Sequence, residues 1–305
     1  MRVALVKEFG GISSVELSEW PDPTPTARQA VVRVRAAGVG PWDVKLISGA
    51  FGTLPLPYIP GFEVAGVVES VGDGVDVQPG DPVYANLAGG GFAHRALVSV
   101  DHLARKPDGL SFEEAAGLVV GGGTAYEGLV DRGRLMPGET VLVTAAAGGV
   151  GSAAVQIAAA VGARPLGVAG PRNHDYLLGL GASDAFDYHA ADWVQQVLAA
   201  VPRGVDMLFD GAGGETRDRA LGGVREGGRG EFLLGPPAEL ERGIKGDTFS
   251  ADITRQRLEA LGRLVDAGKL RPQIEAAIPF EQVREALERV AGGHTRGKIV
   301  LQIGQ

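Results

Sequence analysis

The chain has 305 residues and none of them is cysteine. This absence excludes disulfide bonds, thiol nucleophiles and metal sites built from thiolate ligands. Basic residues are also scarce: 29 Lys and Arg face 37 Asp and Glu, for a net charge of -8. Since nucleic-acid binding needs a basic face, no nucleic-acid partner is expected.

Long apolar runs are missing as well. No run of about 18 apolar residues occurs, so no membrane-spanning helix and no membrane partner are expected. The amino-terminal residues 1–8 lack the apolar stretch of a signal peptide and are typical of a first strand. Together with the lack of cysteine, these features predict a cytoplasmic protein.

Glycine, by contrast, is abundant, with 48 residues, roughly double its ordinary share. The other proportions, 45% hydrophobic and 22% charged, are those of a folded protein. The glycine excess therefore indicates many tight turns and close backbone approaches. A chain of this length is expected to form two domains.

The first part of the chain predicts a β-rich, barrel-like domain. Short apolar segments bounded by Gly and Pro are typical of strands. The expected strands are 29–35, 62–71, 83–85 and 91–99, with one short helix at 41–47 that Gly49 ends.

From Ser111 the pattern changes to alternating strands and helices. Ser111 and Glu114 have the spacing of a capping box, which marks the start of a helix. Continuous apolar strands that alternate with helices predict a doubly wound parallel sheet. The expected strands are 140–144, 165–169, 185–187, 205–210 and 230–234, and the expected helices are 149–161, one ending at 176–181, 190–200 and 215–222.

The tail departs from this alternation. We expect a long amphipathic helix at about 251–268, an extended segment at 271–278, a helix at 280–290 and a terminal strand at 297–303. Because the strands expected between residues 140 and 234 already make up the sheet of the second domain, the tail is expected to return to the first domain.

The most informative motif follows the strand 140–144. It reads Ala145-Ala146-Ala147-Gly148-Gly149-Val150-Gly151. A diphosphate approaches the backbone at a helix N-terminus, where side chains would block it. Alone, this motif could be an ordinary turn of a glycine-rich protein, since Ala146 stands at the first glycine of G-x-G-x-x-G. The strand before it and the helix after it favour dinucleotide binding.

The end of the next strand bears on which dinucleotide binds. NAD-binding proteins place an acid there to hold the ribose 2′-hydroxyl, but this segment has no acid before Asp175. It offers Arg172 instead, whose guanidinium fits a 2′-phosphate. Arg172 could also be a solvated loop residue; we favour NADP(H).

In sequence order, several motifs resemble the zinc-independent medium-chain dehydrogenase/reductases, on the quinone oxidoreductase (zeta-crystallin-like) branch. The resemblance runs nearly end to end and depends on the set rather than on any single motif. The motifs are residues 36–39, 57–66, 79–81, 110–116, 124–126, 145–151, 181–188 and 293–301.

The resemblance implies an α/β protein of two domains. One is a GroES-like β-rich catalytic domain, residues 1–118 completed by 271–305, and the other is a Rossmann NADP-binding domain, residues 119–270. It implies NADP(H) bound between them, and a homodimer. By analogy, the terminal strands and the sheet edge around 230–234 are expected interfaces.

The resemblance also implies the cofactor-binding residues. They are Thr124, Gly148, Gly149, Val150, Gly151, Gly170, Arg172, Asn173, Tyr188 and Lys298. The run Gly121–Gly123 has no phosphate or turn explanation, and we expect the cofactor cleft to flex there.

The chain departs from its zinc-dependent relatives at the metal site. Phe62 stands where their Gly-His-Glu motif has the ligand histidine, and no cysteine is available. The five histidines contain no spaced pair that could replace these ligands and are expected to be structural or exposed. We therefore expect no metal.

The candidate catalytic or pocket residues are Asp43, Lys45, Phe51 and Tyr58. Lys45 stands where the quinone reductases have a tyrosine. It could stabilise developing negative charge or simply be solvated, and Asp43 could serve only as a helix cap.

Without a metal, a conjugated acceptor is the easier substrate, because the charge left after hydride addition spreads over several atoms. The predicted activity is NADPH-dependent reduction of a quinone, enone or other activated double bond, with a small hydrophobic carbonyl or quinone as substrate. The alternatives are an NADPH-binding redox sensor or regulatory protein with little turnover, and an assembly protein.

Overall fold

The computed structural model describes residues 1–50, 55–237 and 239–304. The chain divides into two compact units. Unit 1 comprises Met1–Val120, Ile253–Asp266 and Pro272–Gln305, and unit 2 comprises Gly121–Asp252 and Ala267–Arg271.

Unit 1 contains a seven-stranded sheet in the order β14-β15-β3-β4-β5-β7, with β6 also paired to β3. Its strands are β3 (Gln29–Val39), β4 (Glu63–Val71), β5 (Pro82–Asn86), β6 (Arg95–Ser99), β7 (Leu103–Arg105), β14 (Ile274–Pro279) and β15 (Lys298–Gln302). A separate pair is formed by β1 (Arg2–Val6) and β2 (Val15–Glu19). The Val- and Ala-rich strands supply most of the buried core of this unit.

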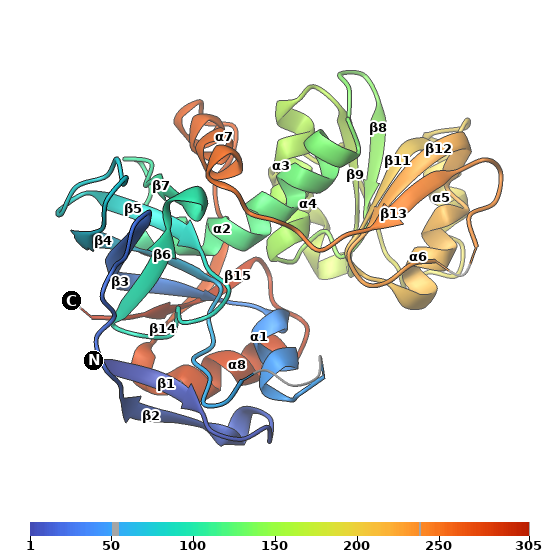
Figure 1. Ribbon diagram of the computed structural model, residues 1–305. Helices are drawn as coiled ribbons and strands as arrows, with labels where there is room; N and C mark the ends of the chain where they lie inside the picture. Colours follow the sequence, from blue (N-terminus) through green and yellow to red (C-terminus); the bar gives the residue numbers. More distant parts are fainter. Residues whose placement is uncertain (51–54, 238, 305) are drawn as a thin grey trace. The chain divides into compact units, whose positions relative to one another are not determined.

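Helices α1 (Pro41–Ile47), α7 (Arg255–Asp266) and α8 (Val283–Ala291) lie entirely within unit 1. Helix α8 presents Ala286, Leu287 and Val290 to the core of the sheet, and it packs beside α1 (Figure 1). These helices and the curved sheet agree with the β-rich domain expected from the sequence.

The C-terminal tail completes this sheet, as expected. Strand β15 runs antiparallel to β3, with Ile299 opposite Val39 and Gln302 opposite Ala36. Strand β14 then lies parallel to β15 at the sheet edge. Residues from the two ends of the chain therefore form one hydrogen-bonded layer.

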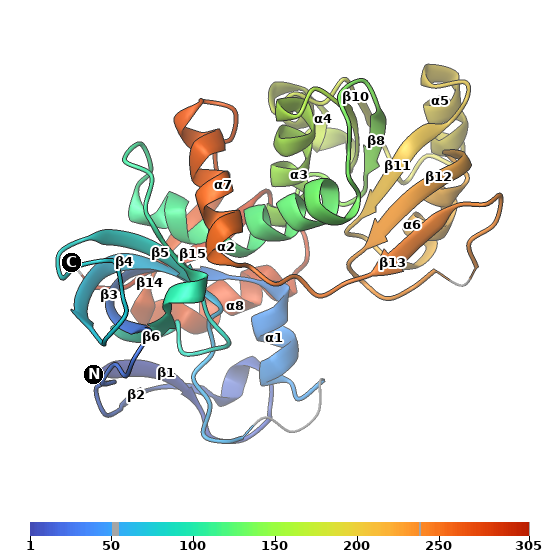
Figure 2. The same cartoon turned by 45° about the horizontal axis from the view of Figure 1, so that its top comes forward.

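Unit 2 contains a parallel sheet in the order β10-β9-β8-β11-β12-β13. Its strands are β8 (Thr140–Val143), β9 (Arg164–Val168), β10 (Asp184–Phe186), β11 (Val205–Asp210), β12 (Val224–Phe232) and β13 (Lys245–Thr248). Its helices are α3 (Gly149–Ala160), α4 (His174–Gly179), α5 (Trp193–Ala200) and α6 (Gly214–Leu221). Helices α3 and α4 cover one face of the sheet and α5 and α6 the other (Figures 1 and 2), which confirms the doubly wound arrangement.

One strand of this sheet was not expected. Strand β13 has the sequence Lys-Gly-Asp-Thr, which contains no large apolar residue and only one good strand former. It pairs in parallel with β12. The segment 230–234, expected to lie at the sheet edge, is therefore covered by β13, and the edge itself is the charged strand β13.

The glycine run 121–123 also differs from expectation. It lies inside the continuous helix α2 (Phe112–Tyr126), which begins at the predicted capping box: Ser111 N donates to Glu114 Oε2 at 2.9 Å and Glu114 N to Ser111 Oγ at 3.1 Å. A Cβ at Gly121 would lie 2.9 Å from the carbonyl oxygen of Gly149. The glycine thus permits a close approach of α2 to the start of α3, and flexing is not needed to explain it.

Helix α7 likewise differs from the predicted division, which placed residues up to 270 with the nucleotide domain. The compact division assigns it to unit 1. There the hydroxyl of Tyr84 donates to the carbonyl of Leu258 at 2.5 Å, and Arg255 forms a two-pronged ion pair with Asp76.

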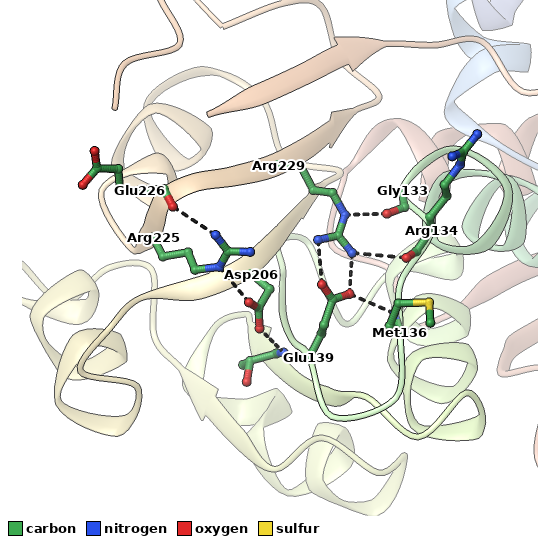
Figure 3. A network of polar contacts seen from close by, with 9 residues as sticks. Gly133, Arg134, Met136, Glu139, Asp206, Arg225, Glu226 and Arg229 are labelled. Atoms are coloured by element: carbon green, nitrogen blue, oxygen red, sulfur yellow. Dashed lines mark hydrogen bonds and ion pairs between the residues drawn. The ribbon is translucent and has the colours of Figure 1, made fainter. Parts of the chain in front are cut away.

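At the amino end of β8, a network of charged groups fixes the turn that leads into the strand (Figure 3). The guanidinium of Arg229 on β12 donates to both carboxylate oxygens of Glu139 and to the carbonyl of Gly133. Glu139 also accepts from the backbone N–H of Met136 at 2.8 Å. Beside it, Arg225 donates to Asp206 at 2.7 Å. The opposite, carboxyl end of β8 carries the phosphate-type loop.

Candidate nucleotide site and candidate active site

The loop after β8 has the geometry of a phosphate-binding turn. Ala145 adopts a left-handed conformation with φ 49°, and Gly148 is the N-cap of α3 with φ -77° and ψ 178°. Among the described residues, no side chain caps this end of α3. The first backbone N–H groups of the helix therefore remain available to an anion.

Gly148 and Gly151 of this loop differ in whether the fold itself requires glycine. At Gly151 a Cβ would lie 2.3 Å from the carbonyl oxygen of Ala145, so the loop itself requires glycine. At Gly148 a Cβ would meet only the Ala145 oxygen, at an ordinary 3.5 Å, and the backbone angles suit any residue. The fold does not require glycine at Gly148, whereas a ligand that approaches the backbone does.

Thr124 and the loop share unit 2. Thr124 is buried on α2, three residues after Gly121, so both lie on one face of the helix. Because Gly121 faces the carbonyl of Gly149, this face is turned toward the phosphate-type loop. The structure therefore brings Thr124 to the same side of α2 as the loop. Gly149 and Val150 form the first turn of α3.

The other predicted cofactor residues of unit 2 follow β9 and β10. Gly170 caps a short 3-10 helix that contains Arg172 and Asn173, and Asn173 N donates to the Gly170 carbonyl at 2.9 Å. Arg172 is exposed. A Cβ at Gly170 would be 4.0 Å from the ring of Tyr188, so the two loops lie against each other. Three successive parallel strands thus end in the predicted nucleotide-binding loops.

A buried polar pair at the ends of β8 and β11 was missed at the sequence level. The hydroxyl of Thr144 donates to Asp210 Oδ1 at 2.5 Å, and both side chains have no exposed surface. Asp210 Oδ2 accepts from the backbone N–H of Gly213 at 3.0 Å. The signal was an acid that directly follows the apolar run 207–209, because a buried carboxylate must find hydrogen-bond donors.

In unit 1, Asp43 is a buried carboxyl that connects two segments. Its Oδ2 accepts from the N–H of Gly40 at 2.9 Å, and its Oδ1 from the N–H of Gly61 at 3.0 Å. The first bond caps α1, which begins with Pro41, so the capping role considered for Asp43 is present. The second bond holds the segment that leads into β4.

Burial raises the pKa of Asp43 to about 7. The two backbone donors and the charge of Lys298 act in the opposite direction, and the charge of Glu63 adds to the rise. Asp43 therefore changes its charge near neutral pH, although it is only 2% exposed.

Next to Asp43 lies a buried ion pair between Lys298 and Glu63. Glu63 is 2% exposed and its Oε2 also accepts from the N–H of Val120 at 2.8 Å. A Cβ at Gly40 would be 3.6 Å from Lys298 Nζ and 3.8 Å from Asp43 Oδ2, so these groups surround the same point. A Cβ at Gly38 would lie 2.4 Å from Glu63 Cδ, which explains that glycine.

Of the predicted pocket residues, Tyr58 is in this neighbourhood. Its hydroxyl is buried and has no hydrogen-bond partner among the described residues. Burial, with a smaller contribution from the charge of Asp43, raises the pKa of Tyr58 above its ordinary value. The hydroxyl therefore keeps its proton at neutral pH.

The remaining predicted pocket residues are not placed in this cluster. Lys45 is half-buried on α1 but follows Asp43 by two positions, and residues at that spacing point to different sides of a helix. Phe51 lies outside the described residues. Trp42, which precedes Asp43 on α1, is 44% exposed.

Comparison with known proteins identifies the family. The quinone oxidoreductase of Mus musculus is 33% identical over 322 residues, which covers 99% of this chain and 97% of that protein. The chain belongs to the medium-chain dehydrogenase/reductase family, on its quinone oxidoreductase-like branch. As an oxidoreductase of this family it uses a nicotinamide cofactor.

Other comparisons agree with this assignment. Residues 26–108 match the alcohol dehydrogenase GroES-like domain, and residues 180–301 match the zinc-binding dehydrogenase family. The synaptic vesicle membrane protein VAT-1 homolog of Rattus norvegicus is 32% identical, covering 100% of this chain and 84% of that protein. A solved structure described as an NAD-dependent alcohol dehydrogenase superposes with a TM-score of 0.92 at 30% identity over the whole of both chains. The predicted GroES-like and Rossmann domains of this dehydrogenase/reductase are thereby confirmed.

Two kinds of feature are absent from the described residues of this family member: a metal-binding group and a membrane-spanning helix. Within residues 1–50, 55–237 and 239–304, no three His, Asp or Glu side chains are grouped so that they could hold a metal ion. Over the same ranges, no helix is long and apolar enough to cross a membrane.

Glu63 was not predicted as a site residue, although it lies within the motif at residues 57–66. A usable signal was present: Glu63 and Lys298 are charged residues at the first positions of β4 and β15, and each is followed directly by an apolar run. Charges in such positions are normally buried only in pairs.

Proposed function

We propose that the protein is an NADPH-dependent reductase that transfers hydride to a quinone, enone or similarly activated double bond without a metal. The observation that carries the nucleotide part is Gly148. The fold does not require glycine at this position, but the absence of a side chain leaves the N-terminus of α3 open to a phosphate.

The choice of NADP over NAD is supported by the loop after β9. That loop, residues 169–174, offers Arg172 and contains no acid that could accept from a ribose 2′-hydroxyl. One structural neighbour is described as NAD-dependent, so the cofactor preference is the first property to measure.

The donor set of unit 1 supports a metal-free reaction. The chain has no cysteine, and Phe62 occupies the position of a ligand histidine in zinc-dependent relatives. Without a Lewis acid, a simple alkoxide would be hard to stabilise, while the charge of an enolate or hydroquinone is delocalised. The quinone oxidoreductase relatives favour the same substrate class.

When bound, the reduced nicotinamide supplies the hydride. The chain's own residues have to supply binding and the proton that the reduced acceptor takes up. In unit 1, Tyr58 holds a proton at neutral pH, and Asp43 holds one below a pH of about 7. The buried Lys298–Glu63 pair places one charge of each sign near Asp43, where Lys298 lowers its pKa and Glu63 raises it.

The test is oxidation of NADPH against a panel of quinones, enones and simple aldehydes, with and without a chelator. We expect turnover with conjugated acceptors, none with simple aldehydes, and no effect of the chelator. Loss of activity on chelation would contradict the metal-free reaction. Tight NADPH binding without turnover on any acceptor would replace the reductase with a redox sensor.

A further inference from the structure

Two glycines at the end of β3 lie on the same face of the sheet, and only one of the two positions is filled. Gly38 belongs to β3 and Gly40 follows the strand directly, so a side chain at either position would point to the same side. A Cβ at Gly38 would lie 2.4 Å from Cδ of Glu63, whose side chain occupies that space. A Cβ at Gly40 would meet Lys298 Nζ at 3.6 Å and Asp43 Oδ2 at 3.8 Å, which are ordinary contact distances. The structure therefore leaves room at Gly40 that it does not leave at Gly38.

The fold does not require glycine at position 40. Its backbone angles, φ -133° and ψ 166°, are those of an extended chain and suit any residue. Gly40 is partly exposed, and Pro41 and Trp42, which follow it, are exposed, so the space can be reached from solvent. A glycine that has no conformational reason to be glycine, and that lies beside buried charged groups, allows a ligand to approach the backbone.

The ammonium group of Lys298 borders this space and has donors that the protein does not use. Strand β15 runs antiparallel to β3 with Ile299 opposite Val39, which puts Lys298 across from Gly40. Lys298 is 9% exposed, and among the described residues its Nζ donates to Glu63 alone. Since an ammonium carries three N–H groups, two of them lack an acceptor in the described part of the chain. Because an unpaired buried donor is costly, an oxygen atom placed at Gly40 would be favoured there.

The charges around the space favour an uncharged ligand. Lys298 is compensated by the carboxylate of Glu63, with which it forms the buried ion pair. Asp43, whose Oδ2 faces the same space, adds a negative charge once it is ionised, and the charges that act on it are again those of Lys298 and Glu63. The three groups therefore sum to zero or to one negative charge. A carboxylate or sulfonate would gain no net attraction, whereas a carbonyl oxygen needs only the unused N–H donors.

We propose that Gly40 is a specificity-determining residue that admits the carbonyl oxygen of an uncharged quinone or enone to the unused N–H groups of Lys298. This inference rests on the proposed reductase function and assigns Lys298 to the acceptor. As hydride reaches the conjugated carbon, negative charge collects on this oxygen, and a fixed ammonium stabilises it. The resemblance placed Lys298 with the cofactor, so the two assignments predict different effects of filling the space.

The experiment compares the wild type with four variants of the full chain. Gly40→Ala and Gly40→Val fill the space to increasing extents, and Gly40→Ser fills it with a hydroxyl that also suits the N-cap of α1. Gly109→Ala is the matched control, because Gly109 is another glycine of unit 1 and a Cβ there would meet nothing within 4 Å.

Three quantities are measured for each protein. The dissociation constant of NADPH comes from equilibrium fluorescence, and kcat and KM come from NADPH oxidation with naphthoquinone, with a sulfonated naphthoquinone and with benzylideneacetone. Thermal unfolding reports the stability of each variant.

We expect Gly40→Ala to lower kcat/KM for both uncharged acceptors about tenfold, the typical effect of losing one hydrogen bond to a charged group, while NADPH binding stays unchanged. Gly40→Val should lower it further. Gly40→Ser should also lose activity while its thermal stability equals or exceeds that of the wild type, which separates the role of the space from damage to the fold. The wild type should reduce the sulfonated quinone more slowly than the parent quinone, and Gly109→Ala should match the wild type throughout.

Other results overturn the inference in distinguishable ways. A wild type that binds NADPH but reduces none of the acceptors would refute the reductase itself. A wild type with turnover, together with Gly40 variants that keep their kcat/KM, would refute the role of Gly40 alone. Weaker NADPH binding in Gly40→Ala and Gly40→Ser, with unchanged KM for the acceptors, would assign the space to the cofactor. Faster reduction of the sulfonated quinone would refute the restriction to uncharged acceptors.

Discussion

The buried carboxyl of Asp43 makes the stability of unit 1 depend on pH in an unusual direction. Its pKa is about 7 in the folded protein against 3.8 for an ordinary Asp. The folded state therefore binds one proton more than the unfolded state between these values, and its stability falls as the pH rises through that window. Above pH 7 both states are ionised and the contribution is gone.

The magnitude follows from the size of the shift. A difference of about 3 pH units corresponds to roughly 4 kcal/mol, lost at about 1.4 kcal/mol per unit. Other carboxyls, such as Glu139 and Asp206, have lowered pKa values and lose their contribution only in more acidic solution. The effect of Asp43 should thus dominate between about pH 5 and pH 7.

The assay compares urea unfolding of the wild type and Asp43→Asn across that range without cofactor. Asn has no titratable proton, but it leaves one of the two backbone donors, Gly40 or Gly61, without its acceptor, at a cost of about 1–3 kcal/mol. The stability gap between the two proteins should be widest at pH 5 and should narrow steadily toward pH 8. Two curves that run parallel over the whole range would refute the reasoning.

Three further predictions concern unit 2. Gly148→Ala should leave thermal stability unchanged and weaken NADPH binding about tenfold or more. Gly151→Ala should instead lower the free energy of unfolding by about 1–3 kcal/mol, because its Cβ would overlap the Ala145 carbonyl. An equal loss of stability in both variants would refute this distinction. Ala145→Gly should raise the free energy of unfolding by about 1 kcal/mol, since it relieves a left-handed conformation, and a loss of stability in chemical denaturation would contradict this. Glu139→Gln should lower the free energy of unfolding by about 1–2 kcal/mol at pH 7, because the partly buried Arg229 loses its ion pair. Because Arg229 lowers the pKa of Glu139, the difference from wild type should shrink only in acidic solution, as Glu139 is protonated.

The sequence predicted well those elements whose stability depends on residues close together in the chain. The capping box of Ser111 and Glu114, the short helix α1 and the alternation in unit 2 all form as expected. Strand β13 could not be predicted, because its stability comes from pairing with β12 and not from its own residues.

The site was predictable only in part for a similar reason. The phosphate-type loop is one continuous segment with a recognisable spacing. The cluster of Asp43, Glu63 and Lys298 is assembled by sheet topology from three distant parts of the chain. The approach of Tyr188 to Gly170 likewise depends on β9 and β10 lying next to each other.

The return of the tail to the first sheet has a consequence for biosynthesis. Strand β3 leaves the ribosome long before its neighbour β15, because β15 follows it far along the chain. Until then the segment 36–39 of β3 lacks its partner strand on one edge, and the acid Glu63 lacks the ammonium of Lys298. Unit 2, nearly continuous in sequence, has all its strands available earlier. Vectorial synthesis therefore favours completion of the nucleotide-binding unit before the unit that holds Asp43.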